Sequence, residues 1–199
     1  MENRGEGVFL RFDEAAVQEW EAAAFDNPLF ATMRRAHREY RQARNLDPSE
    51  GWPGERYVLL HSLAHALINE LAIECGYSSA SISERIYSRP PGYGPEPMAG
   101  ILLYTSAPDA EGTLGGLVNL GKPSELGPIL RRALERSGLC SSDPLCADHE
   151  PDAATGALHG ACCHACLLVA ETSCERGNRY LDRSVLVDTF GHTGLEFFA

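Results

Sequence analysis

Six of the seven cysteines of this chain lie between residues 140 and 174. The segment GACCHACLLVAETSC, residues 160–174, holds four of them and one histidine, and CSSDPLC, residues 140–146, holds two. Cysteines that only fill a core would be scattered along the chain. Thiolates are soft ligands that suit Zn²⁺ in closed, four-coordinate structural sites. The clustering therefore predicts a structural zinc site.

The spacing of the cysteines indicates which ones bind the metal. Two residues separate Cys163 from Cys166, a spacing that lets both sulfurs reach one tetrahedral ion. Cys174 follows as a third thiol, and CSSDPLC supplies the fourth, while Cys162 is expected to point away and pack. We expect the ligands to be Cys146, Cys163, Cys166 and Cys174, with Cys140 as the alternative upstream ligand.

Redox or nucleophilic chemistry at these thiols is disfavoured, because a crowd of neighbouring thiols captures metal. His149, His159 and His164 are further nitrogen donors, each expected at the surface or beside the site. In HSLAH, His61 and His65 are four residues apart, as in the HExxH zinc-peptidase motif, but Ser62 replaces its glutamate. We expect the two histidines to be hydrogen-bonded inside a packed helix interface.

An enzyme remains the alternative interpretation, although the sequence favours a non-catalytic protein. It would be a hydrolase or nuclease in which His61 and His65 converge with two acidic residues of the loop PDAEGTLGG, Asp109 and Glu111. That loop lacks the GxxxxGK[ST] pattern of a P-loop, and a tight structural turn is the simpler expectation.

Composition indicates a folded protein: hydrophobic residues make up 44% and charged residues 23% of 199 residues. The opening MENRGEGVFLRFDE has no secretory hydrophobic region, and no apolar run approaches the roughly 20 residues of a membrane helix. We expect a cytoplasmic protein without membrane contact, in which thiols stay reduced.

Charge argues against general attraction to nucleic acid, since 28 acidic residues against 17 basic ones give a formal charge of −11. Any DNA contact must be local or made through a partner. A solvated helix surface is the simplest explanation of the basic stretch MRRAHREYRQAR. The candidate contacts for nucleic acid or a partner are Arg34, Arg38 and Arg41 in this stretch and Arg176, Arg179 and Arg183 near the C-terminus.

Hydrophobic patterning predicts an α/β or α+β fold: one small mixed-sheet domain packed on helices, with a cysteine-rich zinc-binding subdomain. Residues 7–12 and 99–107 are expected as strands, and a buried helix is expected to end at Gly76. SSASISERIYS is expected as a short helix, with Ser81 and Glu84 at capping-box spacing. The expected parts are residues 1–50 (strand and helices), 51–139 (α/β core) and 140–199 (cysteine-rich region and tail).

Four segments together resemble one family. They are HSLAHALINELAIECGYSSASISERIY, ILLYTSAPDAEGTLGG, CSSDPLC and GACCHACLLVAETSCERGNRYLDRSVLV. They look like the zinc-binding domain shared by MrfA-type DNA-repair helicases and the DrmB proteins of DISARM phage-defence systems. The resemblance covers about residues 57–187 and is better on the DrmB side. The gap between the two cysteine clusters is wider than in the helicase members.

The resemblance implies a non-catalytic zinc module of a DNA-processing complex, either anti-phage defence or repair. No Walker A sequence and no DEAD or DEAH box is found in the chain, so the ATPase motor would lie on another domain or chain. The expected partner is a superfamily 2 helicase or another subunit of the defence complex, and DNA would be reached through that complex.

Overall fold

A computed structural model describes residues 5–76, 78–105, 116–190 and 192–198. Strand β1 (Gly7–Arg11) is followed by helices α1 (Glu14–Ala24), α2 (Pro28–Gln42) and α3 (Glu55–Cys75). A 3-10 turn (Ser79–Ser81) leads into β2 (Ile82–Tyr87), and then come β3 (Gly100–Thr105), α4 (Gly116–Leu120) and α5 (Pro123–Gly138). Beyond α5 the described chain is mostly turns, with one further 3-10 turn (Arg183–Val185).

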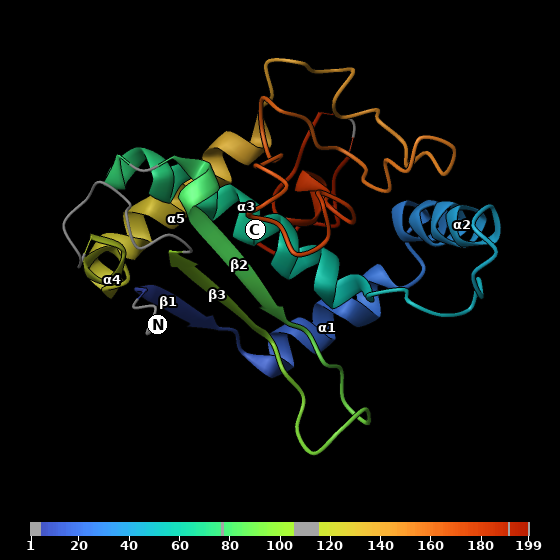
Figure 1. Cartoon of the computed structure of the whole chain (residues 1–199), viewed down its shortest axis with the longest axis horizontal. Coiled ribbons are helices and arrows are strands. Elements are labelled where there is room, and N and C mark those ends of the chain that lie inside the picture. The colour runs from blue at the N-terminus through green and yellow to red at the C-terminus, as the bar shows by residue number, and fades with distance from the viewer. Residues whose placement is uncertain (1–4, 77, 106–115, 191, 199) are drawn as a thin grey trace.

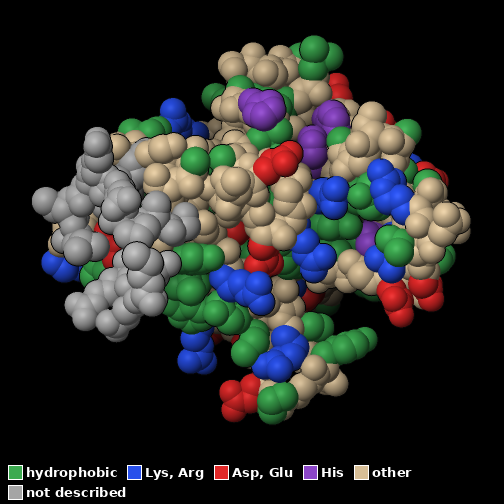
Figure 2. Space-filling view, in the orientation of Figure 1, with side chains coloured by type: hydrophobic (Ala, Val, Ile, Leu, Met, Phe, Trp, Pro, Cys, Tyr) green, Lys and Arg blue, Asp and Glu red, His purple; other side chains and the backbone are tan. Residues whose placement is uncertain are grey.

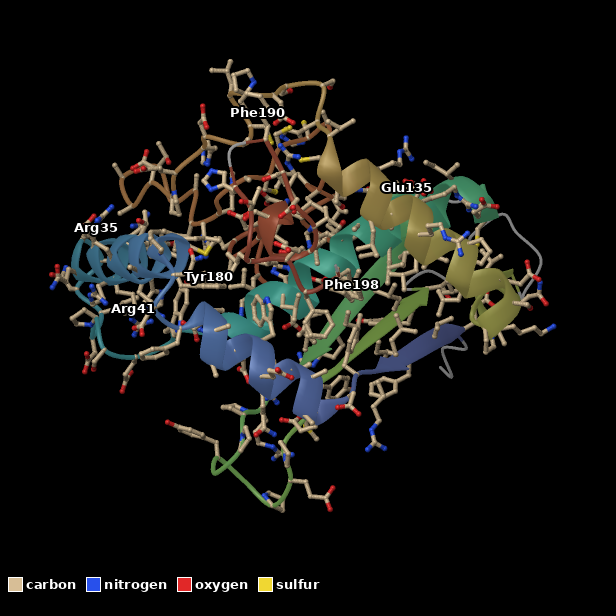
Figure 3. The ribbon with its side chains drawn as sticks, turned by 180° about the vertical axis from the view of Figure 1, so that it is seen from behind. Arg35, Arg41, Glu135, Tyr180, Phe190 and Phe198 are labelled. Atoms are coloured by element: carbon tan, nitrogen blue, oxygen red, sulfur yellow. The ribbon has the colours of Figure 1, made fainter. Side chains whose placement is uncertain are left out.

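The three strands form one antiparallel sheet in the order β1-β3-β2. The expected α/β or α+β class is confirmed, and the antiparallel pairing makes α+β the better description. Helix α3 contacts β2, β3 and α5. Figures 1 and 3 show α3 running between the sheet and the loops of the C-terminal third.

Helix α3 forms the centre of the core, as its apolar periodicity predicted. Leu60, Leu63 and Leu67 are fully buried, and Gly76 closes the helix with a left-handed φ of 67°. Among the described residues, α3 is the one helix long and apolar enough to cross a membrane, but 78% of its most apolar window is buried inside the protein. Burial of this kind is typical of a core helix.

One hydrophobic core joins all three expected parts of the chain. Phe30 of α2, Leu63 of α3 and Leu181 of the C-terminal region belong to the same cluster of buried side chains. A buried arginine adds a polar connection: Arg56 of α3 lies 2.7 Å from Glu14 and 2.6 Å from Glu21 of α1. The cysteine-rich region thus packs on the remaining elements through apolar contacts.

The expected helix at SSASISERIYS is wrong, because residues 82–87 form strand β2. Ile82, Glu84 and Ile86 occupy alternate positions and are all buried, the period of a strand with one face on the core. Pairing with β3 outweighs the local capping-box pattern. The strand carries Glu84 into the interior, only 3% exposed.

Candidate metal centre

Four thiols gather where α5 ends. The sulfurs of Cys140, Cys146, Cys163 and Cys166 all lie within 4.8 Å of one another. The Cys140–Cys163 sulfur distance is 3.4 Å, Cys146–Cys166 is 3.7 Å and Cys163–Cys166 is 3.8 Å. Tetrahedral Zn²⁺ with Zn–S bonds of about 2.3 Å places its sulfurs about 3.8 Å apart. The four thiols therefore have the spacing of a zinc site.

Two tight turns hold these thiols. In the first, the backbone N–H of Cys140 donates to the Asp143 carboxylate over 2.9 Å, and Asp143 is in turn paired with the buried Arg183. In the second, the N–H groups of Cys166 and Leu167 both donate to the Cys163 carbonyl, each over 3.1 Å. Each turn presents two sulfurs on its inner side.

Backbone amides stabilise negative charge on the sulfurs. The N–H of Ser142 donates to Cys140 Sγ and that of Ala165 to Cys163 Sγ, each over 3.4 Å. Burial raises the pKa of Cys163, but the Ala165 amide and the neighbouring polar groups outweigh it and lower that pKa to about 7. Burial raises the pKa of Cys166 to about 12, so the thiols cannot all ionise without a cation among them. The donor set fits Zn²⁺.

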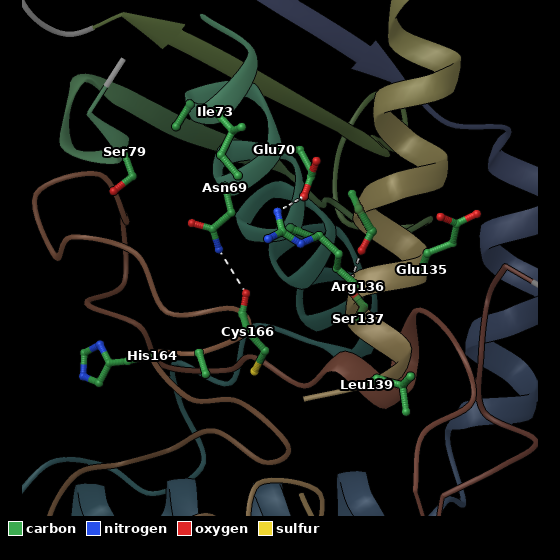
Figure 4. Close-up of a pocket in the computed structure, with 14 residues that line it drawn as sticks. Asn69, Glu70, Ile73, Ser79, Glu135, Arg136, Ser137, Leu139, His164 and Cys166 are labelled. Atoms are coloured by element: carbon green, nitrogen blue, oxygen red, sulfur yellow. Dashed lines mark hydrogen bonds and ion pairs between the residues drawn. The ribbon is translucent and has the colours of Figure 1, made fainter. Parts of the chain in front are cut away.

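This four-thiol group borders a cleft between α3, α5 and the cysteine-rich loops (Figure 4). On its walls Asn69 Nδ2 donates to the Cys166 carbonyl over 3.0 Å, and Arg136 of α5 lies 2.5 Å from Glu70 of α3. The first contact fixes the second turn against α3, and the second joins α5 to α3.

The four-thiol group differs from the expected ligand set in one residue. Cys140 stands with Cys146, Cys163 and Cys166, whereas Cys174 lies in another group. Cys162 belongs to neither cluster and is 2% exposed in the hydrophobic core, as expected for a packing residue.

Cys174 belongs to a second cluster of potential ligands, with His61, His65 and Glu84. His61 Nε2 lies 2.9 Å from Glu84 Oε1 and 3.1 Å from Cys174 Sγ, and His65 Nε2 lies 3.4 Å from Glu84 Oε1. The two histidines and the Glu84 side chain are completely buried. We call this the buried quartet.

Electrostatics within the buried quartet are strong. Burial lowers the pKa of His61, but the Glu84 carboxylate outweighs it and raises that pKa to about 10. Burial raises the pKa of Cys174, but hydrogen bonds and charges from His61 and His65 lower it to about 6. The carboxylate and the thiolate therefore require positive charge beside them.

The three other histidines proposed as nitrogen donors lie outside both clusters. His149 and His159 stack on each other with ring centroids 4.7 Å apart, and His164 is exposed at the edge of the cleft. Asp109 and Glu111 lie outside the described residues. Their convergence with His61 and His65 thus stays a prediction, although both histidines are closed off from solvent.

Comparison with known proteins supports the metal assignment. The family model of the MrfA Zn-binding domain matches residues 63–167, about half of the chain, including all four thiols of the group at the end of α5. The chain belongs to this family. It is also 41% identical over 203 aligned residues to the DISARM protein DrmB of Bacillus paralicheniformis, an alignment that covers 100% of this chain and 34% of the relative. The chain thus spans about a third of that relative's length, and the resemblance noted from sequence is confirmed.

In this MrfA Zn-binding domain protein, the arginines predicted as contacts lie in different environments. Arg34 is paired with Glu55, and Arg41 donates to the Asp47 carbonyl over 2.5 Å. Arg183 is not a surface contact as expected: it is fully buried, and it donates to the Ser137 carbonyl over 2.9 Å and pairs with Asp143. It holds the first cysteine turn.

The remaining predicted contacts, Arg38, Arg176 and Arg179, lie on one face together with Arg41 and with Arg44, which was not predicted. The Arg179 guanidinium lies 5.1 Å from the Tyr40 ring centroid on α2, and that of Arg44 lies 3.6 Å from the same centroid. Arg38 and Arg176 are exposed, and together with Arg41 they add to the lowering of the His37 pKa that burial mainly causes. We call Arg38, Arg41, Arg44, Arg176 and Arg179 the arginine face. Basic side chains gather over α2 in Figure 2, and Arg41 and Tyr180 lie beside each other in Figure 3.

Sequence reasoning missed Glu84 as a site residue. The alternation of Ile82, Glu84 and Ile86 was the available signal, since a strand would place all three on one face. No spacing rule links Glu84 to His61 or Cys174, because only the fold brings a strand, a helix and a loop together.

Proposed function

We propose that the chain is a zinc-stabilised, non-catalytic scaffold domain of a DNA-processing defence complex of the DISARM type. In this proposal Cys140, Cys146, Cys163 and Cys166 hold one Zn²⁺, and the domain docks on a superfamily 2 helicase or another subunit of the complex in the cytoplasm. DNA is then reached through the assembled complex. A repair complex is the related setting, because the family description names MrfA.

The observation that carries the proposal is the four-thiol group in a member of a zinc-binding family. Four protein ligands leave no open position for a water or substrate, so the metal would serve structure and not catalysis. Its ligands join turn 140–146 to turn 163–166, in a region where regular helices and strands are missing from the described residues. Metal binding would supply folding free energy that this region lacks.

Partnership rests on the comparison with DrmB. The similarity runs along the whole chain, and the relative bears the name of a DISARM protein. Surfaces whose conformation the zinc stabilises would be available to bind the partner.

Elemental analysis of Cys146→Ser tests the metal assignment. We expect this variant to lose one equivalent of zinc per chain relative to the wild-type protein. Cys75→Ser is the matched control, because Cys75 is a partly exposed thiol outside both clusters. Equal zinc in wild type and Cys146→Ser would contradict the assignment.

Copurification tests docking. The chain, expressed with an affinity tag in its native host, is expected to retain a superfamily 2 helicase, and Cys146→Ser to retain less of it. Recovery of the folded, zinc-loaded chain without any helicase or defence subunit would overturn the docking proposal.

The arginine face supports a second candidate, a local contact with the DNA backbone. Five arginines from two distant segments share one side of a strongly acidic chain. Fluorescence anisotropy with a short duplex should give weak binding that falls steeply with salt. Arg38→Glu with Arg179→Glu should reduce affinity and lower the salt slope by about 0.9 per lost phosphate contact. Arg131→Glu, an exposed position on α5, is the control, and equal binding by both variants would sink this candidate.

A further inference from the structure

The buried quartet has the donor chemistry of a metal site in its own right. It offers two imidazole nitrogens, one carboxylate oxygen and one sulfur, all within 4.8 Å of one another. The four side chains come from α3, β2 and the loop that follows the cysteine-rich turns. None of them belongs to the four-thiol group.

The hydrogen bonds on the far side of the rings fix what each histidine presents to the quartet. His61 Nδ1 lies 3.2 Å from the Tyr180 carbonyl and His65 Nδ1 lies 2.9 Å from the Leu167 carbonyl. A carbonyl only accepts, so both Nδ1 atoms carry the proton and donate it. With a cation bound, both rings would be neutral and their Nε2 lone pairs would face that cation beside Glu84. A backbone carbonyl behind each imidazole is the usual support of a metal-bound histidine.

Two buried atoms of the quartet are left over. His65 Nε2 and Glu84 Oε2 have no hydrogen-bond partner among the described residues, although His65 Nε2 is 3.4 Å from Glu84 Oε1. Leaving a buried polar atom unpaired costs about 1–3 kcal/mol. If both rings were protonated, hydrogen bonds from the two imidazolium groups would be expected to satisfy these atoms. A cation at the centre of the quartet would contact all four donor groups, and neither ring would then need a second proton.

Cys174 accepts backbone N–H groups in the same manner as two thiols of the four-thiol group. The N–H of Arg176, two residues further on, donates to Cys174 Sγ over 3.4 Å. Cys140 and Cys163 accept an N–H from the residue two positions later at the same distance. A further N–H, from Asn178, reaches Cys174 Sγ over 3.1 Å. Two residues of this loop, Gly177 and Asn178, have a φ of 59°, the left-handed conformation that curls the backbone around the sulfur.

Charge balance agrees with a divalent ion. Glu84 and Cys174 together carry two negative charges when ionised, and neutral His61 and His65 add none. One divalent cation would make the buried group neutral. Buried charge is costly unless it is compensated. Four such groups can therefore lie in the core only if their charges are balanced.

We propose that His61, His65, Glu84 and Cys174 form a second, fully buried metal site that binds Zn²⁺ with two nitrogens, one oxygen and one sulfur. Its four protein ligands and its burial make it a structural site. It fastens α3 to β2 and to the loop 174–178, and it stands independently of the function proposed above.

Metal counting on the full chain tests this second site. Wild-type protein purified with Zn²⁺ is expected to hold two zinc ions per chain by elemental analysis. Glu84→Gln and Cys174→Ser should each hold one, whereas Glu171→Gln, at an exposed glutamate, should keep two. Cys146→Ser should also hold one, but from the other site, so failures of the two assignments are distinguishable.

Spectroscopy separates the sites and covers the case in which Cys174→Ser does not fold. X-ray absorption of the wild-type zinc protein should show five sulfur and three nitrogen or oxygen ligands over two ions, the sum of both clusters. In Glu84→Gln the remaining zinc should show four sulfurs. A wild-type protein with one zinc in an all-sulfur environment, unchanged by Glu84→Gln, would overturn the proposal in favour of a proton-bearing quartet.

Discussion

The two clusters of potential ligands differ in how the chain builds them. The four-thiol group comes from two turns of one irregular segment, and two of its members, Cys163 and Cys166, are partly exposed. The buried quartet takes its members from α3, β2 and a loop, and is closed off from solvent. One cluster shapes a segment that has little regular structure, whereas the other joins layers of the core.

The clusters also touch through consecutive residues. Cys166 contributes a sulfur to the four-thiol group, and the carbonyl of Leu167 accepts from His65 of the buried quartet. A single turn thus contributes to both clusters. A variant that disrupts one cluster should therefore partly destabilise the other. Variants of each cluster should show how far the two regions act separately.

Metal removal should have the largest effect. A strong chelator is expected to lower the melting temperature by about 20 °C or more, since structural zinc contributes on the order of 10 kcal/mol and each kcal/mol shifts a chain of this size by about 2–4 °C. Limited proteolysis should cut first between residues 147 and 161, where the described chain has only turns and an isolated bridge. The same chelator saturated with Zn²⁺ is the control. Unchanged melting and digestion would show that neither cluster depends on metal.

Glu84→Ala should rank second, with a loss of about 3–5 kcal/mol in the free energy of unfolding, because it leaves buried partners uncompensated. Urea unfolding measures the loss. Glu171→Ala, at an exposed position, should stay within about 0.5 kcal/mol of wild type. Equal free energies of unfolding for the two variants would show that the buried quartet does not stabilise the contacts between core layers.

Arg183→Met should cost less, about 1.5–3 kcal/mol, the value of hydrogen bonds to a charged group. It leaves the Ser137 carbonyl and Asp143 without their partner and loosens the first cysteine turn. Arg179→Met, from the arginine face, is the comparison variant. Equal stability of the two would mean that Arg183 does not connect the thiol group to the core.

The smallest effect should come from His37, which lies apart from both clusters. Burial lowers its pKa, and Arg41, Arg176 and Arg38 lower it further, against the hydrogen bond to the Glu50 carbonyl. Because the folded pKa is below the unfolded value of about 6.5, the unfolded chain binds the proton more readily. This contribution to stability is complete above about pH 6.5 and is lost as the pH falls.

Urea midpoints at about pH 7.5 and about pH 5.5 measure that loss. The wild-type midpoint should fall more than that of His37→Gln over this range. His159, whose pKa is also lowered by burial, contributes equally to both proteins and cancels in the difference. A larger fall in the variant would reverse the assigned sign.

Sequence patterns were sufficient where local periodicity and tertiary packing agree. The apolar spacing of α3, the run that becomes β3 and the Cys163-x2-Cys166 pair all point to what the fold contains. They were insufficient where two solutions satisfy the same spacing. Cys140 and Cys174 are both within reach of Cys163 along the chain, and only the direction of the turns decides between them. Arg183 belongs to a basic sequence segment, but the Ser137 carbonyl and Asp143 draw it inward.

The sequence separation of the ligands has a consequence for the order of folding. Cys140 and Cys163 are 23 residues apart, whereas His61 and Cys174 are 113 apart. Closing the longer loop costs about 1.4 kcal/mol more in chain entropy, and it also needs α3 and β2 to be paired with their neighbours beforehand. The thiol group can thus close early around a local nucleus. We expect the buried quartet to form last, once α3, β2 and the loop 174–178 have packed together.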